Sequence, residues 1–164
     1  MKVMIGALWL TLAAGGLARA AAPSDGVLAT VHQFIDNFNR GDTKAAEAAH
    51  APDVAIIDEI PPHEWHGTGA FQAWVADLEK ASQAAGQTDE KVTLGRSIRT
   101  QVDGDTAYAV VPVTFTFKQH GKPMIEPAQM AFALRKEPAG WKITGWAWSG
   151  TVPHPARAGA KPKR

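Results

Sequence analysis

The sequence predicts an α+β fold in which a curved antiparallel sheet wraps around three N-terminal helices. Two observations support this prediction. In the first half of the chain, apolar side chains recur at three- and four-residue steps, which is typical of amphipathic helices. From Lys91 onwards they alternate with polar side chains over long runs, which is typical of half-buried strands. Helices and strands are therefore segregated along the chain, which disfavours an alternating α/β fold.

Three helices are expected, over about residues 24–39, 43–50 and 68–85. Gly41 ends the first helix, because glycine accepts the left-handed backbone of a helix stop. Pro52 closes the short second helix. The third helix buries a face that carries Phe71, Trp74, Val75 and Leu78.

Strands are expected over residues 54–60, 91–102, 106–119, 126–136 and 141–152. Pro61-Pro62 ends the first strand, since proline cannot donate a hydrogen bond to a sheet. Asp103-Gly104-Asp105 is typical of a hairpin turn between the second and third strands. Four antiparallel strands at the end of the chain complete the predicted sheet.

Composition and length divide the 164 residues into three parts. Residues 1–20 are interpreted as a signal peptide, because a basic start and an apolar run precede the small residues Ala18 and Ala20 of a cleavage site. An uncleaved anchor is the alternative. Residues 21–152 form one domain, and residues 153–164 are expected to be a disordered basic tail. The sequence therefore predicts a periplasmic or secreted protein that is not inserted in the membrane after cleavage.

The charge of the predicted domain argues against nucleic-acid binding. The chain has 17 basic and 16 acidic residues; two of the basic residues lie in 1–20 and four lie in the tail, which leaves 11 basic against 16 acidic residues in the domain. A nucleic-acid surface requires clustered Lys and Arg on the domain itself. There is no cysteine, so the stability of an exported chain must come from its core.

The stretch from Asp53 to Leu78 holds the densest set of ionisable groups beside apolar residues. Asp58 lies near the inner end of an apolar strand, where partial burial would raise its pKa and make it a usable base. Its neighbour Glu59 is expected on the opposite face by strand alternation. His63 and His66 are candidate assistants in acid–base chemistry. Together with Asp58 these histidines could alternatively form a three-ligand metal site, but their spacing in a loop favours no metal.

Three segments carry a family resemblance: the helix end Phe38–Asp42 with sequence FNRGD, the strand start Asp53-Val54 and the loop His66-Gly67. Together they resemble the nuclear transport factor 2-like superfamily, in its SnoaL-like and ketosteroid-isomerase-like branch. The resemblance covers about residues 27–150 and implies a cone fold with an internal pocket. The superfamily includes isomerases, dehydratases, cyclases and binding subunits, so the resemblance leaves the function open.

The ketosteroid isomerases imply roles for three positions. Asp58 stands where they have their general base. Phe34 stands where they have a tyrosine that donates a hydrogen bond to the oxyanion, and Gln129 stands near their second donor. Because phenylalanine cannot donate a hydrogen bond, steroid isomerase activity is not expected.

The remaining aromatic residues suggest two surfaces. The predicted ligand-binding residues are Phe34, Trp65, Trp74, Phe115, Phe117 and Gln129. Trp146 and Trp148 are expected on the outer face of the last strand, where exposed aromatic side chains would form a homodimer interface. A β-bulge is the alternative, since it would turn both indoles into the pocket.

These observations predict an exported protein that binds a small apolar molecule, with possible isomerase- or lyase-type chemistry at Asp58 and no cofactor. The alternative is a non-catalytic homodimerising module with a vestigial pocket. An open apolar cavity of several hundred cubic ångströms with Asp58 at its wall would favour ligand binding. A filled cone, or Asp58 pointing into solvent, would favour the module.

Overall fold

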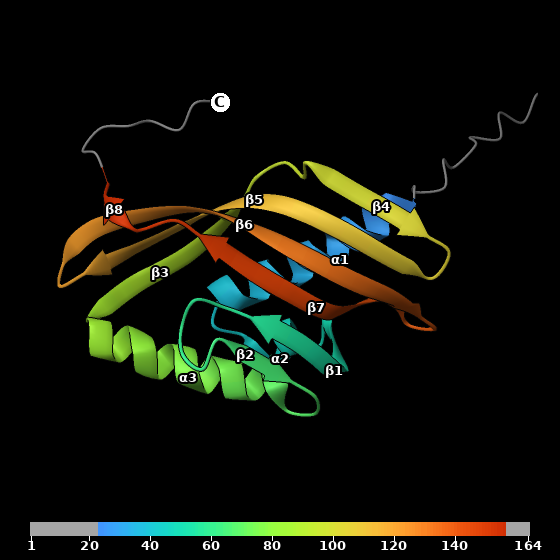
Figure 1. Cartoon of the computed structure of the whole chain (residues 1–164), viewed down its shortest axis with the longest axis horizontal. Coiled ribbons are helices and arrows are strands. Elements are labelled where there is room, and N and C mark those ends of the chain that lie inside the picture. Colours follow the sequence, from blue (N-terminus) through green and yellow to red (C-terminus); the bar gives the residue numbers. More distant parts are fainter. Residues whose placement is uncertain (1–22, 157–164) are drawn as a thin grey trace, which may run out of the picture.

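The computed structural model describes residues 23–156, which contain three helices (Figure 1). They are α1 (Pro23–Asn39), α2 (Thr43–Glu47) and α3 (Ala70–Ala85). The side chain of Asp42 caps α2 by accepting a hydrogen bond from the Ala45 amide at 3.0 Å. Gly86, in the left-handed conformation, ends α3. Within these residues no helix is long and apolar enough to cross a membrane.

Eight strands form one curved sheet within the described residues. They are β1 (His50–Ile57), β2 (Glu64–His66), β3 (Gln87–Leu94), β4 (Arg99–Asp103), β5 (Thr106–Gln119), β6 (Lys122–Glu137), β7 (Gly140–Gly150) and β8 (His154–Pro155). The order across the sheet is β2-β1-β7-β6-β5-β3, while β4 also pairs with β5 and β8 pairs with β6. The pair β1–β7 is parallel, and the other strand pairs are antiparallel.

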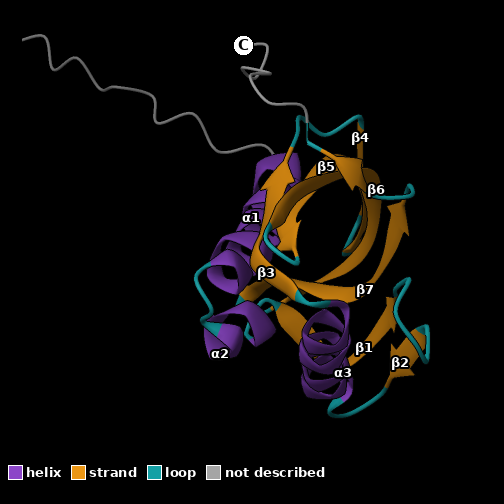
Figure 2. Ribbon diagram, turned by 90° about the vertical axis from the view of Figure 1, so that its left-hand side faces the viewer, coloured by secondary structure: helices purple, strands orange, loops and turns teal. Residues whose placement is uncertain are grey.

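The sheet curves around α1, and α3 packs beside β1, β2 and β3 (Figure 2). Alternation along the long strands gives the sheet one apolar inner face. On β6 the inward residues run from Glu126 through Met130 to Leu134 at every second position. The apolar stripe of α1, with Val27, Val31 and Phe34, packs against this inner face and forms the centre of the core.

The α+β fold class expected from the sequence is confirmed, with changes of detail. The sheet is mixed, because β1 lies parallel to β7 instead of antiparallel. The strand expected over residues 91–102 is two strands, β3 and β4, which pair with different parts of β5. The second helix ends at Glu47, and His50 already belongs to β1.

Two of the predicted segments lie at the ends of the chain, namely the signal peptide and the basic tail. The predicted signal peptide, residues 1–20, lies outside the described residues. The predicted tail begins too early at Pro153, because His154 and Pro155 pair with β6 and the Ala156 amide donates a hydrogen bond to the Pro123 carbonyl at 3.0 Å. Residues 157–164 lie outside the described part.

Candidate functional site

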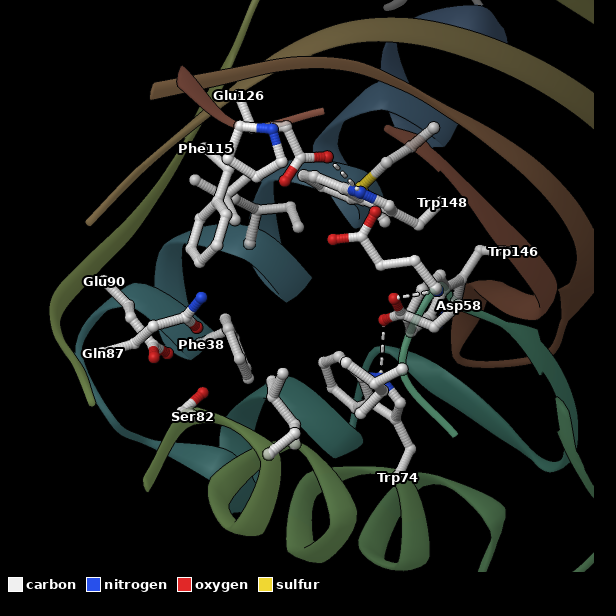
Figure 3. A pocket seen from close by; sticks show the side chains of 18 of the residues that line it. Phe38, Asp58, Trp74, Ser82, Gln87, Glu90, Phe115, Glu126, Trp146 and Trp148 are labelled. Carbon is white, nitrogen blue, oxygen red and sulfur yellow. Dashed lines mark hydrogen bonds between the residues drawn. The ribbon is translucent and has the colours of Figure 1, made fainter. Parts of the chain in front are cut away.

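A cavity of about 170 Å³ lies between α1, α3 and the inner face of the sheet (Figure 3). Its walls are mainly aromatic and aliphatic, and its polar groups are few, as is usual for a small-molecule site. The cavity is smaller than the several hundred cubic ångströms expected for a ligand site. A cavity of about 150 Å³ with apolar walls is nevertheless enough to hold benzene in another protein. The aromatic residues that line it are Phe34, Phe38, Trp74, Phe115, Trp146 and Trp148.

Asp58 lies at the wall of this cavity, immediately after the end of β1. The indole Nε1 of Trp74, on α3, donates a hydrogen bond to its Oδ2 at 2.8 Å, and the Glu59 amide donates one to its Oδ1 at 2.6 Å (Figure 3). Burial raises the pKa of Asp58, and the hydrogen bond from Trp74 opposes that rise. Asp58 is therefore a carboxyl group with a fixed orientation and a raised pKa beside apolar walls.

A second carboxyl cluster joins Glu59, Glu126 and Trp148 around Gly150. Trp148 Nε1 donates a hydrogen bond to Glu126 Oε1 at 3.0 Å. A Cβ atom at Gly150 would lie 2.8 Å from Glu59 Oε2 and 2.7 Å from Trp148 Nε1, and it would collide with Glu126 Oε1. The two carboxyl groups are thus close neighbours, and they have room only because residue 150 has no side chain.

The electrostatics of this cluster favour a shared proton. Partial burial of the carboxyl group and the adjacent Glu126 carboxyl raise the pKa of Glu59 to about 7, although the residue as a whole is exposed. Glu126 is 0% exposed, and burial raises its pKa as well, against the hydrogen bond from Trp148. Two carboxyl groups that share a site seldom ionise together. The cluster can therefore hold or release a proton near neutral pH.

Some buried polar atoms beside the cavity have no hydrogen-bond partner among the described residues. They are Glu126 Oε2, Ser82 Oγ and Trp146 Nε1, and all three residues line the cavity. Leaving a buried polar group unpaired costs about 1–3 kcal/mol. These atoms are consequently available to a ligand or to ordered water.

Sequence reasoning missed Glu59 and Glu126. Glu59 was expected on the opposite face from Asp58, but β1 ends at Ile57, so strand alternation does not extend to these two residues and both line the cavity. Glu126 carried a usable signal. It lies at even spacing from Met130 and Leu134 in a predicted strand, and this spacing puts it on the inner face.

Other predicted site residues lie elsewhere. His63 and His66 are exposed, and neither lines the cavity. Trp65 is buried against α3, where its Nε1 donates a hydrogen bond to Asp77 Oδ2 at 2.9 Å. Phe117 is buried outside the cavity lining and stacks on Phe115. Of the six predicted ligand-binding residues, the cavity lining includes Phe34, Trp74 and Phe115.

Gln129 is exposed on the outer face of β6, beside Ser149 of β7. The position expected for a second hydrogen-bond donor therefore points away from the cavity. Its neighbours Ala128 and Met130 take the inward positions instead. The inward carboxyl of β6 is Glu126, three residues before the position that the resemblance suggested.

Trp146 and Trp148 face inward, so the expected outer aromatic surface is wrong. The register of β7 against β6 shifts between Ile143 and Gly145, which leaves Thr144 as an extra residue. Beyond this bulge Trp146 lies opposite Phe132 and Trp148 lies opposite Met130, on the inner face. The bulge that was the alternative interpretation therefore places both indoles in the cavity wall.

The SnoaL-like domain family model matches residues 27–153, which is more than three quarters of the chain. The chain belongs to the SnoaL-like domain family. Its match spans all the elements that form the cavity, from α1 to Pro153. No curated protein matches the sequence.

Solved structures of the same superfamily share the fold of this SnoaL-like protein. Hexachlorocyclohexane dehydrochlorinase LinA-type3 from Novosphingobium barchaimii LL02 is similar with a TM-score of 0.68 at 9% identity, over 82% of this chain and 90% of that one. A ketosteroid isomerase-like protein from Erwinia carotovora atroseptica SCRI1043 has a TM-score of 0.62 at 19% identity, over 79% and 96%. A nuclear transport factor 2-like protein from Salmonella enterica has a TM-score of 0.64 at 16% identity, over 87% and 97%. The resemblance inferred from the sequence is confirmed at the level of the fold.

Proposed function

We propose that this protein binds a small, largely apolar molecule in the cavity and moves a proton on that molecule with its carboxyl groups. The observation that carries the proposal is the position of Asp58, held by Trp74 at the wall of an apolar cavity. Solved relatives of the same fold include a dehydrochlorinase and a ketosteroid isomerase-like protein, which supports acid–base chemistry as the class of reaction.

In the proposed reaction Asp58 is the base. A C–H bond next to an electron-withdrawing group breaks, and its proton moves to Asp58 Oδ while the electron pair stays on the substrate. The protonated form of the Glu59–Glu126 pair then donates a proton to the site where negative charge accumulates. In an isomerisation that site is another atom of the substrate, and in an elimination it is the leaving group. The predicted assistants His63 and His66 have no part in this scheme, because both lie outside the cavity.

The test is solvent deuterium exchange on one-ring carbon acids such as phenylacetone. Proton removal by Asp58 should speed exchange at the activated carbon above the buffer rate, and Asp58→Asn should abolish the increase. His66→Gln is the matched control, because His66 is exposed and outside the cavity. Equal exchange rates for wild type and Asp58→Asn would contradict the proton transfer. Tryptophan emission measures ligand binding directly, because Trp74, Trp146 and Trp148 line the cavity. If none of these one-ring compounds changes the emission, ligand binding is contradicted.

Export belongs to the same proposal, since residues 1–20 have the pattern of a signal peptide. Native mass spectrometry of the protein isolated from cells should give the mass of a chain that begins at Ala21, together with any retained ligand. A full-length mass in the cytoplasmic fraction would contradict export. A homodimer would have to use a surface other than Trp146 and Trp148, because the cavity wall contains both.

A further inference from the structure

The cavity has an unbalanced charge pattern. Its lining includes Asp58, Glu59, Glu90 and Glu126, and none of its described residues is Lys, Arg or His. No ion pair joins these four carboxyl groups to a basic side chain within residues 23–156. Several acidic groups therefore lie beside apolar walls without a basic side chain in the cavity lining, while the charge of His63 lowers the pKa of Asp58 from outside the lining.

The Glu126 end of the cavity is built for a partner that is absent from the chain. Glu126 is 0% exposed, one carboxyl oxygen accepts a hydrogen bond from Trp148, and Oε2 has no partner among the described residues. Figure 3 shows Glu126, Phe115 and Trp148 together at this end of the cavity. A buried acceptor without a donor is costly, and a ligand that supplies an N–H group removes that cost.

The walls suit an organic cation better than a metal ion. Within the described part of the chain, no group of three or more His, Asp or Glu side chains is arranged to hold a metal. Aromatic faces attract an ammonium group within about 6 Å of the ring. Phe115 and Trp148 lie with ring centroids 6.1 Å apart and planes at 86°, beside the Glu126 carboxyl. Their apolar surface would also contact the hydrocarbon part of the ligand.

We propose that the ligand is a one-ring organic cation, an aromatic or alicyclic amine whose ammonium group binds Glu126 and Glu59. This inference rests on the proposed function, because it concerns the same cavity, and it names the substrate class. A positive charge beside the two carboxyl groups favours their ionised forms, so with such a ligand the proton donor of the proposed reaction is the ammonium N–H and not the carboxyl pair. Binding should therefore release protons from the site at neutral pH and below.

The experiment compares three probes of similar size by isothermal titration calorimetry: 2-phenylethylammonium, 2-phenylethanol and phenylacetate. The ammonium probe stays protonated up to about pH 9, since alkyl amines titrate near the lysine value of about 10.4. We expect the cation to bind at least about tenfold more tightly than the alcohol, which corresponds to about 1.4 kcal/mol. Phenylacetate should bind most weakly. Titration in two buffers of different ionisation enthalpy should reveal the released protons at pH 6.

Two variants test the assignment to Glu126. In Glu126→Gln the cation should lose about tenfold in affinity, while the alcohol should keep its affinity within about twofold, which also shows that the cavity is intact. Glu64→Gln is the matched control, because Glu64 is exposed on β2 and does not line the cavity. Both probes should bind this control as they bind wild type.

The outcomes separate this inference from the proposed function. Equal affinities for cation and alcohol, or tighter binding of the alcohol, would overturn the cation assignment and leave apolar ligand binding supported. Binding of the cation that is unchanged in Glu126→Gln would overturn the role of the Glu126 end. If none of the three probes binds, the cation assignment fails. The deuterium-exchange experiment on one-ring carbon acids then tests the proposed function independently.

Discussion

Glu126 is the most constrained ionisable residue of the cavity. It is fully buried on a central strand, held by one indole, and adjacent to a second carboxyl group across Gly150. A raised pKa in the folded state means that folding takes up a proton. The free energy of unfolding then falls as the pH rises from the unfolded pKa to the folded one. For Glu59 this window runs from 4.5 to about 7.

Glu126→Gln should reduce this pH dependence. The amide keeps the shape of the side chain but removes the charge that helps to raise the pKa of Glu59. Folding of the variant therefore takes up fewer protons on average than folding of wild type. We expect the stability of wild type relative to Glu126→Gln to decrease from pH 4.5 to 7, by less than the change for one full proton, because solvent screens the exposed Glu59. Urea unfolding at several pH values measures this difference.

The prediction concerns the difference in stability between wild type and Glu126→Gln, because His50 gives the stability of each protein a pH dependence of the opposite sign. Burial lowers the pKa of His50 from 6.5 to about 4, so the free energy of unfolding rises with pH over that window. His50 is present in both proteins and its contribution cancels. Glu64→Gln should behave as wild type. A wild-type pH dependence in Glu126→Gln would contradict the coupling of the two carboxyl groups.

Trp74→Phe should raise the pKa of Asp58 further, because the indole hydrogen bond favours the ionised carboxylate. Loss of a hydrogen bond to a charged group should cost about 1.5–3 kcal/mol of stability above the pKa of Asp58. NMR titration of the Asp58 carboxyl carbon measures the shift. Trp65→Phe is the matched control, since it removes an indole donor from Asp77, outside the cavity. The same Asp58 titration in Trp74→Phe and wild type would contradict the assignment.

At the scale of elements, the bulge in β7 decides which face of the strand reaches the cavity. Ile143 before it and Trp146 after it are both buried, which strict alternation over three residues forbids. Deletion of Thr144 should therefore turn Trp146 and Trp148 outward. The loss of these buried indoles should cost about 3–5 kcal/mol and shift the tryptophan emission to longer wavelength.

Thr144→Ala provides the control for the deletion, because it keeps the residue count and removes only an exposed hydroxyl bonded to the Ala133 carbonyl. Its emission and urea midpoint should stay close to wild type. If the deletion variant also resembles wild type in both measurements, the register does not depend on the extra residue.

The sequence predicts the elements with an unbroken period and fails at the bulged strand β7. The α1 stripe and the long strand β5 could be predicted, because each has many residues in one unbroken period. The orientation of Trp146 could not, since one extra residue reverses every later side chain and alternation alone does not locate a bulge. Asp58 was placed at the cavity wall by the sequence, whereas Glu126, which lines the same cavity, comes from a strand almost seventy residues later. Only the fold brings the two together.

At the scale of the whole molecule, the cavity exists because the curved sheet and the helices leave part of the cone unfilled. Toward the end of α3 the residues that line the cavity are small, namely Ala81, Ser82 and Ala85, whereas the lining residues Trp74 and Leu78 nearer its start are large. Packing alone would favour larger side chains at these positions, since a void forfeits contacts. The small residues thus preserve space at a cost in stability.

Ala81→Leu should fill that space. We expect the variant to be as stable as wild type or up to about 2 kcal/mol more stable, as is common for cavity filling. It should lose at least about tenfold in affinity for 2-phenylethanol and for 2-phenylethylammonium, because the ring no longer fits. Ala84→Leu is the matched control: Ala84 is exposed on the same helix, so the substitution has the same helix propensity and leaves the cavity open. Calorimetric unfolding and titration measure both properties. Wild-type affinity in Ala81→Leu would mean that these molecules bind outside the cavity, whereas lost affinity with unchanged or higher stability would show that the empty space serves binding and not folding.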